Sequence, residues 1–143
     1  MTNSTSITVS LDMAKKLKEA GWPQGRPEFV WEVFKEEIGR EPYLHHYLSG
    51  SFTNNKNRIA WFHAPTAEEI LRRLPDRIEK RLLNVSKYEG NEWVVSFFDP
   101  ADKYRPETYF NSPSLANAAA AMWVYLREND LIDFENCDPR HHE

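Results

Sequence analysis

Residues 82–98 read LLNVSKYEGNEWVVSFF and contain the clearest β-hairpin signal in the chain. Two runs rich in β-branched and aromatic residues, Leu82–Tyr88 and Trp93–Phe98, are separated by a short turn sequence. Gly90 in that turn can adopt the positive φ angle that tight hairpin turns require. The second run is apolar on both faces, which is typical of an inner strand covered by helix on at least one side. This stretch therefore predicts an antiparallel hairpin inside a helix-covered sheet.

Two helices upstream of the hairpin are indicated by their capping residues. Ser10 is a suitable N-cap for an amphipathic helix over Leu11–Ala20. Thr66, followed three residues later by Glu69, has the pattern of a capping box, and Pro75 ends the second helix. Both segments are short and have a narrow apolar stripe, so we expect helices that lie on a sheet.

The region between these helices alternates with a period of two residues. The alternation predicts three strands, over Glu28–Phe34, Tyr43–Leu48 and Arg58–His63. In the first strand, we expect one side to carry Phe29, Trp31 and Val33. Four tryptophans are expected to face the core: Trp31, Trp61, Trp93 and Trp123.

A third helix follows the hairpin after a polar stretch. We expect Ala101–Asn111 to be an irregular connection and the helix to start at Ser112, with Pro113 in its first turn. Apolar residues recur behind this start at helical spacing: Leu115, Ala118, Ala119, Met122, Trp123 and Leu126.

These elements predict an α+β fold in which three helices pack on a mainly antiparallel sheet of about five strands, in the order α-β-β-β-α-β-β-α. A chain of 143 residues suits one domain. We place that single domain at residues 10–132. Residues 1–9 are expected to be a disordered N-terminal tail, and residues 133–143 a flexible acidic and polar C-terminal tail.

Composition limits the classes of function. The chain has 18 basic and 22 acidic side chains and a net charge of −4. Proteins that bind nucleic-acid phosphates normally carry a basic surplus, so the charge argues against that class. A single cysteine, Cys137, cannot form an internal disulfide, which fits a reducing compartment. No secretory signal and no apolar run of about 20 residues occurs. We expect a cytoplasmic protein that does not contact a membrane.

Four segments follow one another as landmarks along the chain: Ser10–Pro23, Ala64–Pro75, Trp93–Val95 and Ser114–Asn129. With these landmarks the chain resembles a group of small uncharacterised bacteriophage- and prophage-encoded proteins of helix–sheet–helix (ABA-sandwich) type. The resemblance spans residues 10–131 and consists of caps, turns and core positions. It implies a helix–sheet–helix sandwich encoded on a mobile element, and it transfers no activity and no site residue.

Histidines are the first candidates for chemistry, because imidazole is the commonest transition-metal ligand. His45 and His46 are adjacent on a predicted strand and so point to opposite faces, which lets at most one of them join His63. A second group of ligand types lies near the C-terminus: Cys137, Asp138, His141 and His142. No carboxylate stands at a fixed spacing from the first set, and the second lies on the predicted tail. We therefore predict no metal site.

No motif for nucleophilic catalysis, phosphate binding or cofactor binding occurs in the chain. Our leading hypothesis is a non-enzymatic accessory or protein-interaction module of phage or mobile-element origin, whose partner is another protein or a second copy of the chain. Its expected interaction face lies on the second and third strands and contains four residues: Tyr43, His45, Tyr47 and Trp61.

Two alternatives remain open. One is a small metal-dependent or hydrolytic enzyme that uses His63 with His45 or His46. The other is a single-strand nucleic-acid binder that stacks bases on an aromatic sheet face.

Overall fold

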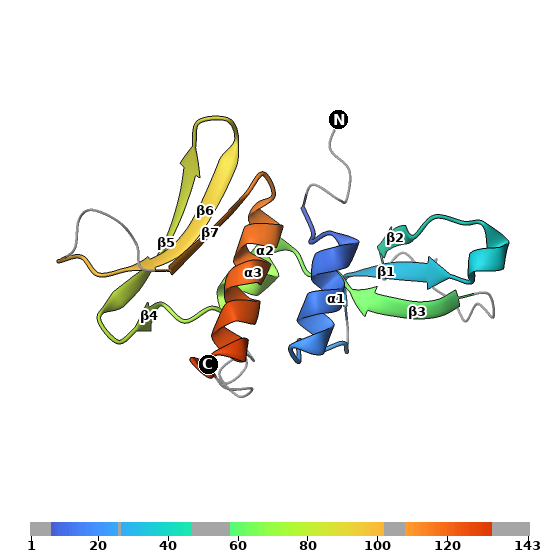
Figure 1. The fold of residues 1–143 in the computed structure, drawn as a ribbon, viewed down its shortest axis with the longest axis horizontal. Coiled ribbons are helices and arrows are strands. Elements are labelled where there is room, and N and C mark those ends of the chain that lie inside the picture. Colours follow the sequence, from blue (N-terminus) through green and yellow to red (C-terminus); the bar gives the residue numbers. More distant parts are fainter. Residues whose placement is uncertain (1–6, 26, 47–57, 102–107, 133–143) are drawn as a thin grey trace. The chain divides into compact units, whose positions relative to one another are not determined.

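The computed structural model describes residues 7–25, 27–46, 58–101 and 108–132 (Figure 1). The chain forms two compact units, Met1–Thr66 and Ala67–Glu143. Over these described residues the fold is α+β, with three α-helices and seven antiparallel strands in two sheets, in the order α-βββ-α-ββββ-α. The predicted class and the three helices are confirmed, and the strands are more numerous than the five expected. The single domain over residues 10–132 stays a prediction.

The first unit is a helix and a three-stranded sheet. Its elements are α1 (Leu11–Glu19), β1 (Phe29–Phe34), the 3-10 helix η2 (Glu36–Ile38), β2 (Tyr43–His46) and β3 (Arg58–His63). The strand order is β2-β1-β3, so β1 is central and pairs antiparallel with both neighbours. The two strands that flank β1 therefore place their side chains on the same two sheet faces as β1.

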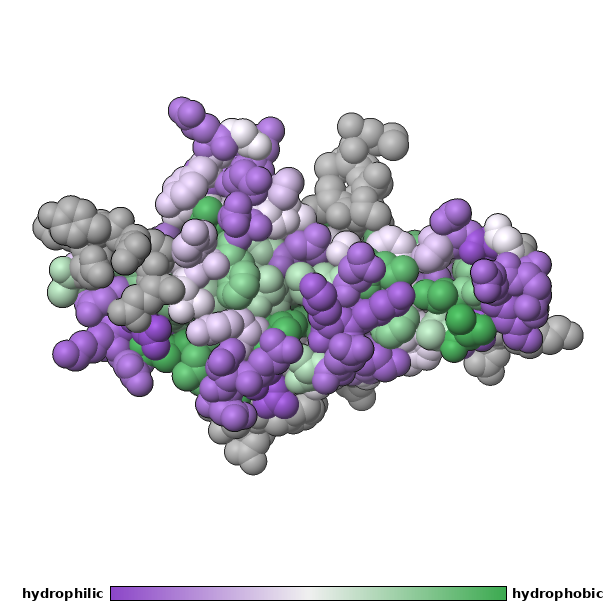
Figure 2. All heavy atoms as spheres, in the orientation of Figure 1, coloured by the Kyte–Doolittle hydropathy of each residue, from purple (hydrophilic) through white to green (hydrophobic). Residues whose placement is uncertain are grey.

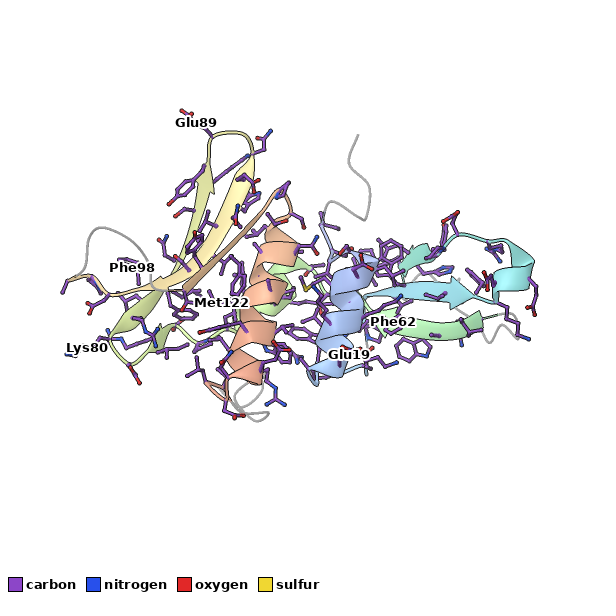
Figure 3. All side chains as sticks on the ribbon, viewed as in Figure 1. Glu19, Phe62, Lys80, Glu89, Phe98 and Met122 are labelled. Atoms are coloured by element: carbon purple, nitrogen blue, oxygen red, sulfur yellow. The ribbon has the colours of Figure 1, made fainter. Side chains whose placement is uncertain are left out.

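Helix α1 begins and packs as its sequence predicts. The Ser10 hydroxyl accepts a hydrogen bond from the backbone N–H of Met13 at 3.3 Å, which caps the helix. Ala14 and Leu17 are fully buried, while the outer face is strongly hydrophilic (Figure 2). Phe62 of β3 lies on the side of the sheet next to α1 (Figure 3). The helix thus covers part of one sheet face with a narrow apolar stripe.

The packed part of this unit includes residues before the capping serine. Thr8 forms an antiparallel bridge with Thr66, and the N–H of Val9 donates to the carbonyl of Pro65 at 3.2 Å. Both Thr8 and Val9 are fully buried. Residues 8 and 9, which we had assigned to the N-terminal tail, therefore belong to the packed unit. Residues 1–6 and the predicted C-terminal tail lie outside the described residues.

Strand β1 alternates as the sequence predicts, with Phe29, Trp31 and Val33 on one side and Val30, Glu32 and Phe34 on the other. Val30, Glu32 and Phe34 are buried, whereas Trp31 and Val33 are half-buried. The expectation that Trp31 faces the core is therefore wrong. The carboxylate of Glu32 is held inside.

The second unit is a four-stranded sheet with two helices. Its elements are α2 (Ala67–Arg73), β4 (Arg77–Ile78), β5 (Arg81–Tyr88), β6 (Glu92–Phe98), β7 (Thr108–Ser112) and α3 (Leu115–Glu128). The strand order is β4-β5-β6-β7, so β6 is an inner strand, as the sequence predicts. Gly90 in the β5–β6 turn has a φ of 80°, also as expected. Helix α3 packs on β6 and β7, and α2 packs on α3.

Two boundaries in this unit correct the sequence analysis. Strand β7 occupies the end of the stretch Ala101–Asn111, which we had expected to be irregular. Its residues are polar on either side of the adjacent aromatics Tyr109 and Phe110, so they resemble a loop, and pairing with β6 makes them a strand. Helix α3 starts after Ser114, whose hydroxyl accepts from the N–H of Asn117 at 3.1 Å, and not at Ser112.

Helix α3 forms the core of the unit. Its buried residues are Ala116, Ala118, Ala119, Ala120, Met122, Trp123 and Leu126. Met122 points from α3 towards the strands (Figure 3), and the rings of Phe110 and Tyr125 lie 5.7 Å apart. The run of alanines lets the helix approach the sheet closely.

Tryptophan burial departs from the expectation at three of the four positions. Trp123 is fully buried, but Trp31, Trp61 and Trp93 are only half-buried. Trp22, which follows α1, is buried instead, and its main-chain N–H donates to the carbonyl of Leu17 at 2.8 Å. No helix in the described part of the chain is long and apolar enough to span a membrane.

Candidate functional site

The register of the first sheet brings three of the four expected interaction residues to one face. Tyr43 and Trp61 both pair with Glu32, from β2 and β3 respectively, and His45 pairs with Val30 two positions away. Directly paired residues of neighbouring strands lie on the same side of a sheet, as do residues two apart on one strand. Tyr43, His45 and Trp61 therefore share a face. Tyr47 lies outside the described residues.

At the centre of this face is a buried carboxylate. The side chain of Glu32 is only 5% exposed. Its Oε1 contacts Nε2 of His45, and its Oε2 accepts a hydrogen bond from Nη1 of Arg58 at 3.2 Å. Burying a charged group is unfavourable unless it is paired and hydrogen-bonded, and here both oxygens have a partner. We call the surface formed by Glu32, Tyr43, His45, Arg58 and Trp61 the Glu32 face.

Arg58 reaches this face because of a β-bulge. The pairing of β1 with β3 shifts register between Val33 and Phe34, so that Val33 pairs with Ala60 but Phe34 pairs with Arg58. Strict alternation would have placed Arg58 on the same side as Ala60, away from Glu32. A bulge inserts an extra residue and redirects the side chains beyond it. The bulge therefore supplies the second cationic partner of the carboxylate.

Aromatic rings flank the buried carboxylate on the two outer strands. Tyr43 is 54% exposed, and its ring meets that of His45 edge-on with centroids 4.4 Å apart. Trp61 is half-buried. Lys18 of α1 lies near it: the ammonium is 5.8 Å from the ring centroid and donates to the carbonyl of Trp61 at 3.3 Å. The result is a fixed polar centre between two partly exposed aromatic side chains.

His63, another candidate, takes part in a different set of contacts. It is only 3% exposed, and its Nδ1 lies 3.1 Å from Nε1 of Trp22 and 2.9 Å from the carbonyl of Pro23. The main-chain N–H of His63 donates to Oε1 of Gln24 at 2.9 Å. His63 therefore anchors the segment that follows α1.

The three histidines do not converge. His45 and His63 both pair with Val30 but from opposite sides, which separates their backbones by two strand spacings, about 9 to 10 Å. His46 faces the other side of the sheet, as expected, with its ring centroid 5.0 Å from that of Phe29 and its Nε2 3.7 Å from a carboxylate oxygen of Glu28.

Metal-ligand geometry is absent from the part of the chain that the structure describes. No group of three or more His, Cys, Asp or Glu side chains there could hold a metal ion. The second set of candidates, Cys137, Asp138, His141 and His142, lies outside the described residues. His63 contacts Trp22, and His45 contacts Glu32. The two histidines that the enzyme alternative would combine therefore take part in different sets of contacts.

Sequence reasoning missed the two charged residues of the site. Glu32 had a detectable signal, because it is the one acidic residue in an otherwise apolar and aromatic strand, Phe29–Phe34. Arg58 had no detectable signal in the sequence, since its orientation depends on the bulge and not on the residue pattern.

No protein-family model, curated protein or solved structure matches this chain. In the part of the chain that the structure describes, the fold and the site are those of an α+β protein with two antiparallel sheets, the first of which carries a buried Glu–His–Arg cluster between an exposed tyrosine and a half-buried tryptophan.

Proposed function

We propose that this protein is a non-enzymatic accessory or protein-interaction module of phage or mobile-element origin, and that it docks a partner protein through the Glu32 face. One observation carries the proposal: Tyr43 and Trp61 flank Glu32 on the same sheet face, while the carboxylate is held by His45 and Arg58. Tyrosine, tryptophan and arginine are the residue types that contribute most to binding energy at protein interfaces.

The contacts within the cluster hold its side chains in fixed positions. A general base must present a carboxylate or imidazole nitrogen to the proton that it abstracts. Both oxygens of Glu32 are engaged, and Nε2 of His45 is engaged by one of them. Side chains that are held in place before binding lose less conformational entropy on association. These contacts therefore favour a preformed docking surface.

Charge supports a protein as the partner. With 18 basic and 22 acidic side chains the chain has no basic surplus, and the basic group of the Glu32 face is neutralised by a carboxylate. Nucleic-acid binding draws most of its affinity from contacts between basic side chains and phosphates. The assignment to a phage or mobile element rests on the resemblance of the landmarks between Ser10 and Leu131.

The test begins with tagged protein used to capture partners from host lysate, with and without nuclease. The captured protein is identified by mass spectrometry, purified, and titrated against the wild type, Tyr43→Ala and Tyr109→Ala. Tyr109 is a matched control because it is 56% exposed and lies in the other unit. We expect Tyr43→Ala to weaken the complex at least about fivefold without lowering thermal stability.

Two results would contradict the proposal. If Tyr43→Ala and Tyr109→Ala bind the purified partner equally well, the Glu32 face is not the docking surface. If nuclease removes everything that co-purifies, and affinity for a single-stranded oligonucleotide falls steeply with salt, nucleic-acid binding replaces protein binding.

A further inference from the structure

The sheet of the second unit ends at β7, whose outer edge carries no further strand within the described residues. β7 pairs with β6 on one side, over five consecutive residues without a register shift (Figure 1). In the described part of the chain, no main-chain hydrogen bond joins β7 to another element. Alternate N–H and C=O groups of an edge strand point away from its sheet. The outward groups of β7 can therefore pair with an added strand.

The residues of β7 do not oppose such pairing. Sheet edges are usually protected by charged side chains, proline, a bulge or a very short strand. β7 has five residues, none of them charged and none of them proline, and its pairing with β6 has no bulge. The opposite edge of the same sheet, β4, has two residues, one of which is Arg77. On the edge of β3, side chains of Lys18 and Gln24 occupy main-chain groups.

The sequence of β7 is suited to pairing with a second copy of itself. Residues that stand opposite each other in an antiparallel pair lie on the same sheet face, so a symmetric pair is centred on one residue. Centring on Phe110 pairs all five residues: Phe110 with itself, Tyr109 with Asn111 and Thr108 with Ser112. No like charges meet, and aromatic and hydroxyl pairs across strands are stabilising.

Helix α3 fits the same arrangement. It contacts both β6 and β7, so its axis lies above these two strands. With strands about 4.8 Å apart, the two copies of α3 would lie about 10 Å apart, a usual distance between packed helices. Tyr125 marks the side of α3 next to β7, because its ring lies 5.7 Å from that of Phe110. Tyr125 and Ala121, one turn earlier, are uncharged and half-buried, so they can pack against the second helix.

The chain leaves the other helix of this unit towards the opposite edge of the sheet. Helix α2 ends at Arg73 and β4 begins at Arg77. Between them, the carbonyl of Asp76 accepts from the N–H of Leu83 on β5 at 2.9 Å. β4 and β5 lie at the far side of the sheet from β7. The end of α2 is therefore held on that side.

We propose that β7 pairs antiparallel with β7 of a second copy of the chain. Two four-stranded sheets then form one continuous sheet, with both copies of α3 side by side on one face. A two-fold interface of this kind closes on itself, and such dimers are the commonest homo-oligomers. The interface lies in the second unit and does not involve the Glu32 face.

The test uses two double variants of the full chain at exposed positions of β7. Tyr109→Lys with Asn111→Lys places like charges opposite each other twice, whereas Tyr109→Lys with Asn111→Glu places opposite charges there. Sedimentation velocity from about 1 μM to about 1 mM protein measures the dissociation constant. We expect the wild type to dimerise, and the Lys/Lys variant to dimerise about fivefold to tenfold more weakly than the Lys/Glu variant.

Hydrogen exchange of the wild type gives a second measurement that needs no variant. Alternate amides of β7 should exchange more slowly at high than at low protein concentration, because dimerisation places them in a ladder. Tyr43→Ala is the control for the first unit, where Tyr43 is 54% exposed, and it should dimerise like the wild type.

Four results would overturn the proposal. The wild type could stay monomeric up to about 1 mM, or its β7 amides could exchange at the same rate at all concentrations. The two double variants, folded by circular dichroism, could dimerise equally well or both be monomeric, which would exclude the paired positions 109 and 111. Loss of the dimer in Tyr43→Ala would place the contact on the Glu32 face instead.

Discussion

Nη1 of Arg58 donates to Oε2 of Glu32 across 3.2 Å, although Arg58 pairs with Phe34 and not with Glu32. The contact is diagonal, and it exists because the bulge between Val33 and Phe34 turns Arg58 to the side of the sheet where Glu32 lies. His45 holds the other carboxylate oxygen from the opposite strand. The buried side chain of Glu32 thus links the central strand of the first sheet to both neighbouring strands.

Removing the carboxylate should destabilise the first unit. Glu32→Gln leaves Arg58 mostly buried beside a neutral group, and breaking a buried ion pair in this way costs about 2 to 4 kcal/mol of unfolding free energy. Urea unfolding followed by the fluorescence of the tryptophans measures the change. Arg72→Ala removes the exposed pair with Glu68 and should change stability by about 0.5 kcal/mol or less. Equal stability of Glu32→Gln and wild type would show that the cluster is not a buried ion pair.

Replacing both charges together should cost less than the sum of the single changes. In Glu32→Leu with Arg58→Met, no unpaired charge is left behind, and the apolar side chains fill similar volumes. We expect an interaction energy of about 1 to 3 kcal/mol in a double-mutant cycle built from the two single variants and the double variant. Additive losses would mean that the two side chains stabilise the sheet independently.

The contact between Trp22 and His63 gives a separate prediction for the same unit. Trp22→Phe keeps a buried ring but removes the indole donor 3.1 Å from Nδ1 of His63. We expect the free energy of unfolding to fall by about 1 to 3 kcal/mol, because the variant leaves a buried ring nitrogen without this donor and creates a small void. Nitrogen chemical shifts of the His63 ring report the tautomer directly. Unchanged ring shifts in the variant would contradict a hydrogen bond between these side chains.

Two serines near the start of α3 have different expected effects. Ser114 caps the helix through the N–H of Asn117, so Ser114→Ala should lower the free energy of unfolding by about 1 kcal/mol. The hydroxyl of Ser112 accepts from the N–H of Ser114 at 3.1 Å, before the helix begins. Ser112→Ala should therefore cost less than Ser114→Ala. Thermal unfolding of both variants measures the difference, and the reverse order would move the helix start to the earlier serine.

The sequence predicted the helices and the hairpin well because their signals are local. A serine that caps a helix accepts a hydrogen bond from an N–H three residues later, and a glycine in a hairpin turn acts on the residues beside it. Both signals can therefore be seen in the sequence itself. Strand β7 was missed because its two adjacent aromatic residues are flanked by polar ones and no turn glycine precedes them, and only pairing with β6 makes them a strand.

The candidate site was partly predictable for the same reason. Tyr43, His45 and Trp61 could be assigned to one face from strand alternation, which follows from backbone geometry. The burial of Glu32 depends on partners from two other strands, and the position of Arg58 depends on a bulge. Contacts of that kind arise from tertiary structure and cannot be inferred from the spacing of residues in one strand.

The outer edge of β3 has a consequence for assembly. The N–H of Ala64 donates to Phe29 on β1, so the main-chain groups of Trp61 and His63 point away from the sheet. Lys18 donates to the carbonyl of Trp61, and Gln24 accepts from the N–H of His63. These side chains take up the hydrogen bonds that a strand from another molecule would otherwise form. Continuation of this sheet into a neighbouring copy, as in strand-exchanged dimers or fibrils, is therefore opposed along β3, and Lys18→Ala together with Gln24→Ala would open that route to polymerisation.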